Sequence, residues 1–122
     1  MAVRICPQVY QVGGDNLSHP DDCCVYLVES KNKLSLIDTG AGRESERILE
    51  NIEKCGFSPE SIQYILVTHG HIDHIGGLKY FQEKTGALVL AHQLELDAIE
   101  NGNPVLTAAD WYGVKYQPVK VD

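Results

Sequence analysis

The chain has 122 residues, 43% of them hydrophobic and 22% charged, with 10 basic and 17 acidic side chains and a formal net charge of −7. This composition is typical of one globular domain and excludes a disordered or fibrous chain. The basic residues are few and scattered, so we expect no nucleic-acid surface. No apolar run approaches the roughly 20 residues of a membrane span, and the N-terminal residues lack the apolar core of a secretory signal, so we expect a cytoplasmic protein.

The four cysteines, Cys6, Cys23, Cys24 and Cys55, form no C-x-x-C pair. Neither a zinc knuckle nor a disulfide framework is therefore indicated, and we expect reduced, mostly buried thiols. Neighbouring residues of a strand point to opposite faces of its sheet. Joint binding of one metal ion by Cys23 and Cys24 is therefore awkward.

The first half of the chain predicts short strands and one helix. In chain order we expect a strand at residues 9–12, a β-hairpin of residues 24–28 and 34–37, and a helix over residues 43–55. The hairpin is indicated by two apolar runs on either side of the turn Lys31-Asn32-Lys33. The helix is indicated by apolar residues at helical spacing, with Gly56 as its stop.

The second half alternates helices with short apolar strands. In chain order we expect a helical turn at residues 58–60, a strand at 62–67 buried on both faces, a helix at 78–85, a strand at 87–91, a helix at 93–100 and a final strand over 114–121. This alternation predicts an α/β layer in which helices pack on a sheet. No repeat or linker divides the chain, so we expect one domain.

The ten residues THGHIDHIGG, at positions 68–77, contain four side chains of the kinds that bind transition metals. Imidazole and carboxylate groups suit zinc, iron and manganese. His69 and His71 lie two apart in an extended loop, project to the same side and can bind one ion together. Asp73 and His74 lie where the chain turns into the next helix and can reach a second ion. The spacing therefore predicts a metal site.

The remaining candidate residues are expected to support the fold. Asp38 follows the strand at residues 34–37, and loops at the carboxyl ends of strands share one crevice, so we expect it beside the metal site. There it would brace the loop by hydrogen bonds rather than bind metal. His19 and His92 are expected to be solvated. The aromatic residues near the end of the chain are expected to pack rather than to line a pocket, namely Trp111, Tyr112 and Tyr116.

The segment THGHIDHIGG is similar to the signature of the metallo-β-lactamase superfamily, and Ile37-Asp38-Thr39-Gly40 resembles its upstream element. The resemblance implies an αββα sandwich, of which residues 1–122 form the first sheet-plus-helices half, as the truncated N-terminal portion of a single domain. It also implies a site for two metal ions, usually zinc, with iron or manganese as alternatives. The implied activity is hydrolysis of an ester, thioester, lactone, lactam or phosphoester in a small-molecule substrate.

Carried over to this sequence, the resemblance implies that His69 and His71 hold the first ion and that Asp73 and His74 hold the second. A metal-bound hydroxide would be the nucleophile, because metal binding lowers the pKa of water to about neutrality. Asp73 is the implied catalytic residue, which steers that hydroxide and passes a proton to the leaving group. A flavin-linked di-iron relative would use the same ligand types.

The later ligands of the family site have no counterpart here, since no histidine follows His92. A metal ion with two protein ligands is weakly held, so we expect this chain alone to be inactive or weakly active. Half a sandwich also leaves an apolar sheet face uncovered. Three explanations stay open: a piece of a longer hydrolase, which we favour; a non-catalytic metal-binding or assembly half completed by another chain; and a homodimer or domain swap that covers the open face.

Overall fold

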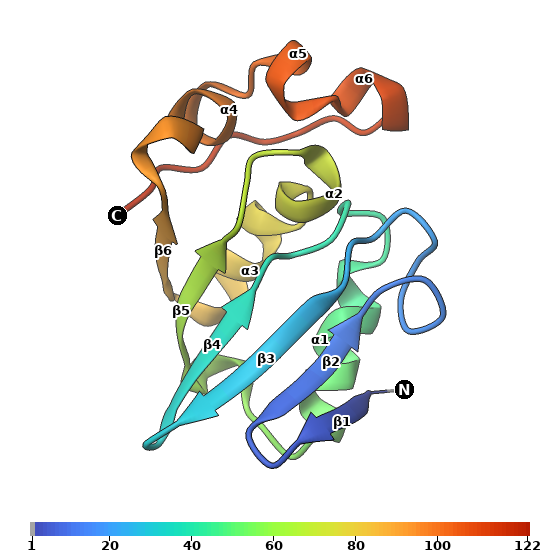
Figure 1. Cartoon of the computed structure of the whole chain (residues 1–122), viewed down its shortest axis with the longest axis vertical. Helices are drawn as coiled ribbons and strands as arrows, with labels where there is room; N and C mark the ends of the chain where they lie inside the picture. The colour runs from blue at the N-terminus through green and yellow to red at the C-terminus, as the bar shows by residue number, and fades with distance from the viewer. Residues whose placement is uncertain (1) are drawn as a thin grey trace.

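A computed structural model describes residues 2–122 as one six-stranded sheet with helices against it (Figure 1). The strands are β1 (Val3–Cys6), β2 (Val9–Gly13), β3 (Val25–Ser30), β4 (Lys33–Ile37), β5 (Ile62–Val67) and β6 (Leu88–Ala91). The helices are α1 (Ser45–Lys54), α2 (Ile72–Ile75), α3 (Leu78–Thr85), α4 (Leu96–Asn101), α5 (Pro104–Thr107) and α6 (Ala109–Tyr112), with 3₁₀ turns η1 (Pro59–Ser61) and η2 (Gln93–Glu95). The α/β arrangement predicted from the sequence is confirmed.

The strands lie in sequence order across the sheet. Strands β1 to β4 form an antiparallel meander, and β4, β5 and β6 are parallel to one another. The predicted hairpin of β3 and β4 turns at Lys31 and Asn32, which both have positive φ. Two-residue turns with positive φ at both positions match the twist of the strands that they join. Parallel neighbours need long crossovers, which the segments containing α1 and α3 supply. The carboxyl ends of β4 and β5 therefore meet at one edge.

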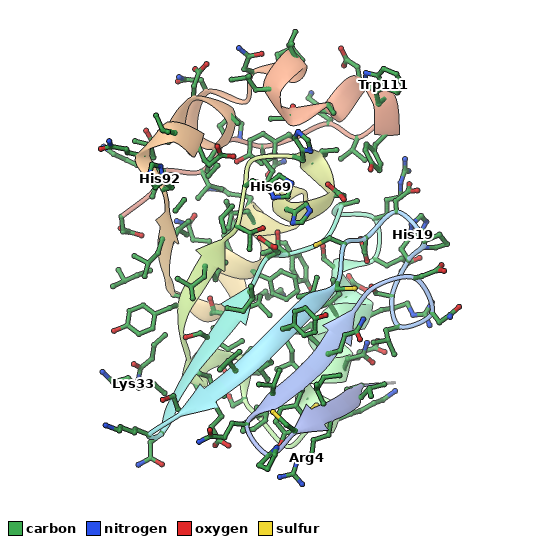
Figure 2. The ribbon with its side chains drawn as sticks, viewed as in Figure 1. Arg4, His19, Lys33, His69, His92 and Trp111 are labelled. Carbon is green, nitrogen blue, oxygen red and sulfur yellow. The ribbon has the colours of Figure 1, made fainter. Side chains whose placement is uncertain are left out.

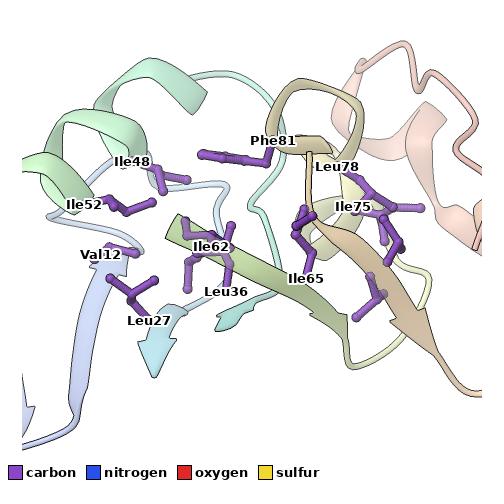
Figure 3. Packing of buried hydrophobic residues seen from close by; sticks show 14 of the residues in the cluster. Val12, Leu27, Leu36, Ile48, Ile52, Ile62, Ile65, Ile75, Leu78 and Phe81 are labelled. Carbon is purple, nitrogen blue, oxygen red and sulfur yellow. The ribbon is translucent and has the colours of Figure 1, made fainter. Parts of the chain in front are cut away.

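Helices α1 and α3 cover one face of the sheet and lie behind it in Figure 1. Their apolar stripes meet the inward side chains of the strands in a single core (Figure 3). The largest fully buried side chains include Leu27, Leu36, Ile48, Ile52, Ile65, Leu78 and Phe81. Burial of this apolar surface is the main stabilising contribution to the layer.

The opposite face of the sheet carries no helix among residues 2–122 (Figure 1). The expectation that residues 62–67 are buried on both faces is therefore wrong: Ile65 is fully buried, but Leu66 is 37% exposed. Leu66 lies between Ile37 and Leu90 in the register, and Leu88, on the same face, is 49% exposed. The open face is thus apolar across at least three strands, and we call it the open sheet face.

Two terminal segments differ from the sequence-based prediction. Strand β1 was not predicted; its four residues are all exposed at the edge of the sheet. Residues 114–121 form no strand; their alternation reflects packing beside α4, where Val119 is buried and the Tyr116 hydroxyl donates to the Ile99 carbonyl at 2.6 Å. Asp122 donates its backbone N–H to Val89 of β6 at 2.8 Å. No helix of the described residues is long and apolar enough to span a bilayer.

The prediction of mostly buried thiols is also wrong. All four cysteines are free; Cys6 and Cys24 are exposed, while Cys23 and Cys55 are half-buried. Cys6 lies on the exposed edge strand β1, and Cys24 lies just before β3, so the fold leaves both in contact with solvent.

Candidate metal centre

The predicted metal-binding loop follows β5 and leads into the short helix α2. Ile72 and Ile75 are fully buried and anchor α2, so the two residues between them, Asp73 and His74, lie at the surface of the site. Figure 2 shows His69 above the carboxyl end of the sheet. The sequence I-D-H-I therefore separates anchoring side chains from candidate ligands within a single helical turn.

The structure brings the three histidine rings of this loop together. The ring centroids of His69 and His74 are 3.9 Å apart, and those of His69 and His71 are 4.8 Å apart. Asp73 joins the group, with its Oδ2 atom 3.6 Å from Nε2 of His74. This donor set, three imidazoles and one carboxylate at short range, fits zinc, iron or manganese.

Asp38 braces the loop through both of its carboxylate oxygens and is only 3% exposed. Oδ1 accepts from the backbone N–H of Thr68 at 2.8 Å, and Oδ2 accepts from the Thr68 hydroxyl at 2.7 Å. Oδ2 also lies 2.8 Å from Nδ1 of His74. Because a carboxylate only accepts, Nδ1 of His74 carries the hydrogen and Nε2 is left free to bind a metal ion.

Asp38 itself has a strained backbone, with φ at 63° in the left-handed region. Such a conformation costs a non-glycine residue of order 1–3 kcal/mol and persists only where the surroundings impose it. Here the hydrogen bonds to Thr68 and His74 do so. The strain thus coincides with the residue that orients a candidate ligand.

Two glycines allow the loops after β4 and β5 to touch. A Cβ atom at Gly76 would lie 2.1 Å from the backbone of Ala41, and one at Gly77 would lie 2.5 Å from the Thr39 carbonyl oxygen. Thr39 also donates its backbone N–H and its hydroxyl to the His74 carbonyl, at 2.8 and 2.7 Å. The two loops therefore form one packed unit, and only glycine fits at this contact.

His69 and His74 have pKa shifts in opposite directions. Burial, followed by the charges of His74 and His71, lowers the pKa of His69 below its ordinary value. Burial also opposes protonation of His74, but the hydrogen bond and charge of Asp38 and the charge of Asp73 raise its pKa overall. At neutral pH the His69 ring is therefore neutral, the form in which an imidazole can bind a metal ion, whereas the neighbouring carboxylates favour the protonated form of His74.

Cys23 adjoins this centre, although nothing in the sequence indicated it. Its backbone N–H donates to the Asp73 carbonyl at 3.3 Å. Its sulfur, a carboxylate oxygen of Asp38 and a ring nitrogen of His74 all lie within 4.8 Å of one another. Burial raises the pKa of the thiol, and the charges of Asp38, Asp73 and Asp22 raise it further, against a hydrogen bond from the Gly40 backbone. The thiol therefore lies in a strongly negative environment.

The two remaining histidines lie in turns outside the cluster. His19 accepts from the backbone N–H of Asp21 at 3.0 Å, and His92 accepts from that of Leu94 at 3.1 Å. Sequence reasoning missed Glu95, whose carboxylate accepts from the backbone N–H of Gly70 at 2.7 Å. That bond ties the C-terminal segment to the histidine loop.

The aromatic residues near the end of the chain behave differently from one another. Trp111 is 91% exposed, so the expectation that it packs against other residues is wrong; it lies on the short helix α6 above the sheet (Figure 2). Tyr112 lies closer to the centre: the charge of Asp73 is the first cause that raises its pKa. Arg43 holds this segment, since it donates to the Tyr112 carbonyl and, at 2.6 Å, to Asp21.

Comparisons with known proteins agree with this geometry. The sequence profile of the metallo-beta-lactamase superfamily matches residues 20–120. The metallo-beta-lactamase GOB-18 from Elizabethkingia meningoseptica superposes with a TM-score of 0.84 and 30% identity over 99% of this chain and 43% of that chain. The chain covers less than half of that structure, so it corresponds to one half of the αββα sandwich, as the sequence predicted.

Two curated relatives are similar over shorter stretches. Exodeoxyribonuclease WalJ of Streptococcus pneumoniae is 38% identical over 77 residues, which is 62% of this chain and 27% of WalJ. The UPF0173 metal-dependent hydrolase of Staphylococcus aureus is 36% identical over 76 residues, which is 61% of this chain and 29% of that protein. The chain thus spans under a third of either relative. From the profile match and the structural likeness together, this chain belongs to the metallo-β-lactamase superfamily.

Proposed function

We propose that this chain carries the first part of a metal-dependent hydrolase site. In this proposal His69 and His71 hold one ion, and Asp73 and His74 hold a second. The observation that carries it is the convergence of three imidazoles, with centroid separations of 3.9 and 4.8 Å, beside two carboxylates. When bound, divalent ions such as zinc, with iron or manganese as alternatives, lower the pKa of water and polarise a carbonyl or phosphoryl oxygen.

Other residues of the site orient a ligand, transfer a proton or hold the loop in place. Asp38 orients the His74 ring through Nδ1, which leaves Nε2 for the ion. Asp73 is proposed as the catalytic residue, because its carboxylate is partly exposed beside His74 and can accept a proton and return it to a leaving group. The buried Ile72 and Ile75 hold both side chains in place.

We propose a small-molecule ester, thioester, lactone, lactam or phosphoester as the substrate. The net charge of −7 opposes a nucleic-acid backbone in the absence of bound cations. A relative of this chain is an exodeoxyribonuclease, which makes a phosphodiester a useful second probe.

The alternative function is a non-catalytic metal-binding or assembly half that needs a second chain. The open sheet face supports it, since Leu66 and Leu88 are 37% and 49% exposed and continuous apolar patches of this kind mark association surfaces. A homodimer or domain swap would cover that face. Both functions use the same four candidate ligands, so metal binding and catalysis must be measured separately.

The test measures zinc per chain and hydrolysis of a thioester and a phosphodiester. It compares the 122-residue chain with a longer chain that continues past Asp122 in its gene. We expect stoichiometric zinc and hydrolysis in the longer chain and weak zinc binding in the short one. The double substitution His71→Ala and Asp73→Ala should abolish both properties, while His92→Ala, a histidine outside the cluster, should change neither. A longer chain that binds zinc without hydrolysis favours the assembly function, and one that binds no zinc rejects both.

A further inference from the structure

Glu95, on the turn η2, hydrogen-bonds to the backbone between two of the candidate ligands. Its Oε1 atom accepts from the backbone N–H of Gly70 at 2.7 Å. Gly70 separates His69 from His71 in the sequence. None of the roles proposed above for the hydrolase site involves this carboxylate. The bond gives Glu95 a direct connection to the pair of histidines proposed to share an ion.

Position 70 requires glycine, because the segment after β6 packs directly on it. Gly70 is buried, and a Cβ atom there would lie 2.5 Å from the Cβ atom of Ala98. Ala98 is 5% exposed and follows Glu95 by three positions, the spacing that places two side chains on one helical face. Glu95 and Ala98 therefore contact the same residue, one by a hydrogen bond and the other by packing.

A glycine between two ligands leaves their relative direction free to vary. Side chains two positions apart project to one side only while the backbone between them stays extended. Glycine adopts a wider range of backbone angles than any other residue. A hydrogen bond to the Gly70 N–H restricts rotation of the peptide group that joins His69 to Gly70. Glu95 thus limits the freedom that the close packing of Ala98 on this glycine makes necessary.

The histidine loop is attached on either side of Gly70 by other groups. The backbone N–H of Thr68 donates to Asp38 at 2.8 Å, and the His71 carbonyl accepts from two N–H groups of α2 at 2.9 and 3.1 Å. The bond from Gly70 to Glu95 lies between these attachments. Its loss would leave both ends of the segment in place, so we expect an effect on side-chain direction rather than on the fold.

The carboxylate reaches the loop from an element that is fixed to the core. Glu95 immediately precedes α4, in which Ile99 is fully buried. The Ile99 carbonyl accepts from the Tyr116 hydroxyl at 2.6 Å and from the backbone N–H of Val119 at 3.3 Å. Helix α4 is therefore held between the core and the last residues of the chain, and Glu95 contacts Gly70 from a fixed position.

We propose that Glu95 is a positioning residue that keeps His69 and His71 directed at one metal ion without contacting the ion itself. It acts through the Gly70 peptide group. The inference rests on the proposed function, because it takes these two histidines as ligands of one ion. The segment after β6 thereby contributes to the metal centre although it supplies none of the proposed ligands.

Proton NMR of the metal-free 122-residue chain tests the arrangement of the two rings before any ion is added. The ring centroids of His69 and His71 are 4.8 Å apart, which is close enough for a nuclear Overhauser effect between the rings. We expect this signal in the wild-type chain. Glu95→Ala should remove it and should speed hydrogen exchange of the Gly70 amide. Glu95→Gln, which keeps a carbonyl acceptor, should restore both properties.

Glu100→Ala is the matched control. The Glu100 carboxylate, also on α4, accepts from the backbone N–H of Val121 at 2.9 Å, so this variant loses a bond of the same type to a segment outside the centre. It should keep the signal between the two rings and the wild-type exchange rate at Gly70. A general loss of stability would affect both variants, whereas loss of the ring signal should be confined to Glu95→Ala.

Zinc affinity is a second readout, measured in the longer chain that continues past Asp122. Glu95→Ala should weaken zinc binding about 10-fold, the lower end of the loss expected on removal of a group that orients a ligand, and Glu95→Gln should stay within about 3-fold of the wild type. Glu100→Ala should leave zinc affinity unchanged.

The outcomes separate this inference from the hydrolase proposal. The positioning role is overturned if the ring signal is absent in the wild type, survives in Glu95→Ala, is lost equally in Glu100→Ala or is not restored in Glu95→Gln. Unchanged zinc affinity of Glu95→Ala, in a longer chain that binds zinc, also overturns it. If the longer chain binds no zinc in any variant, the hydrolase proposal fails, and the ring signal still decides whether Glu95 positions the two histidines.

Discussion

The two faces of the sheet differ in what their side chains contact. On the covered face, Ile65 of β5 packs against the helices and is fully buried; on the open sheet face, its neighbour Leu66 is 37% exposed. Both are large aliphatic residues of one strand. The difference shows that stability of this layer comes from one face, while the other face is apolar enough to associate with a further layer.

The candidate metal centre lies at the carboxyl ends of β4 and β5. Asp38 and Thr68 follow β4 and β5 directly, and α2 packs its two isoleucines into the interior. The centre is therefore supported by the covered face. Substitutions on the covered face, at the centre and on the open sheet face can therefore be compared for their effects on stability, zinc binding and association.

The largest expected effect is on the covered face. Ile65→Ala should lower the free energy of unfolding by about 2–5 kcal/mol, because it leaves a cavity in the core. Leu66→Ala should cost well under half as much, since its side chain already contacts solvent. Urea denaturation of both variants measures the contrast. Equal losses would mean that the open sheet face is covered in solution.

The next largest effect is expected at the candidate metal centre, on both stability and zinc affinity. Asp38→Ala leaves Thr68 N–H without its acceptor and His74 without its partner, so it should cost about 1–3 kcal/mol and lower zinc affinity about 10- to 100-fold. Asp15→Ala, at an exposed loop carboxylate, is the control and should stay within about 0.5 kcal/mol. Isothermal titration with zinc and thermal unfolding check both. Unchanged zinc affinity in Asp38→Ala would remove its orienting role.

A smaller effect concerns pH. The folded-state pKa of His74 is raised, so the pair with Asp38 stabilises the metal-free chain below the unfolded pKa of about 6.5, and that contribution is lost as pH rises through the folded pKa. Thermal midpoints should therefore fall across this interval in the metal-free protein. His74→Gln should flatten the profile, while His92→Gln should not. A flat wild-type profile would contradict the assigned charge pairing.

The smallest effect on stability is expected on the open sheet face. Leu88→Lys should change the free energy of unfolding by no more than about 0.5 kcal/mol. If copies of the chain associate through this face, the same substitution should shift sedimentation towards the monomer. Leu94→Lys is the control, because Leu94 is exposed on η2 and lies outside the sheet. An equal shift in both variants would place the association elsewhere.

Local patterns predicted most of the covered layer. The β3–β4 hairpin, helix α1 and strand β5 were predicted close to their bounds, because apolar spacing and turn residues act over a few positions. The same reasoning missed that β5 is exposed on one side, since an apolar run does not reveal whether a second layer is present. It also interpreted residues 114–121 as a strand, where alternation instead reflects contact with α4.

The candidate site was predicted only where its residues are close in sequence. His69, His71, Asp73 and His74 lie in one loop, and their convergence follows from their spacing; their role as ligands stays a prediction. The brace at Asp38 was expected from its position at a strand end, and the structure supplies its partners. Cys23 had no such signal, because its neighbours come from two loops that are distant in the chain.

The contact between Gly76 and Ala41 leaves no space for a side chain between the two loops. Both partners at this contact are backbone, so the spacing of the loops does not depend on the rotamer of any side chain. An alanine at position 76 would push the loops apart, and with them the two hydrogen bonds by which Thr39 holds the His74 carbonyl.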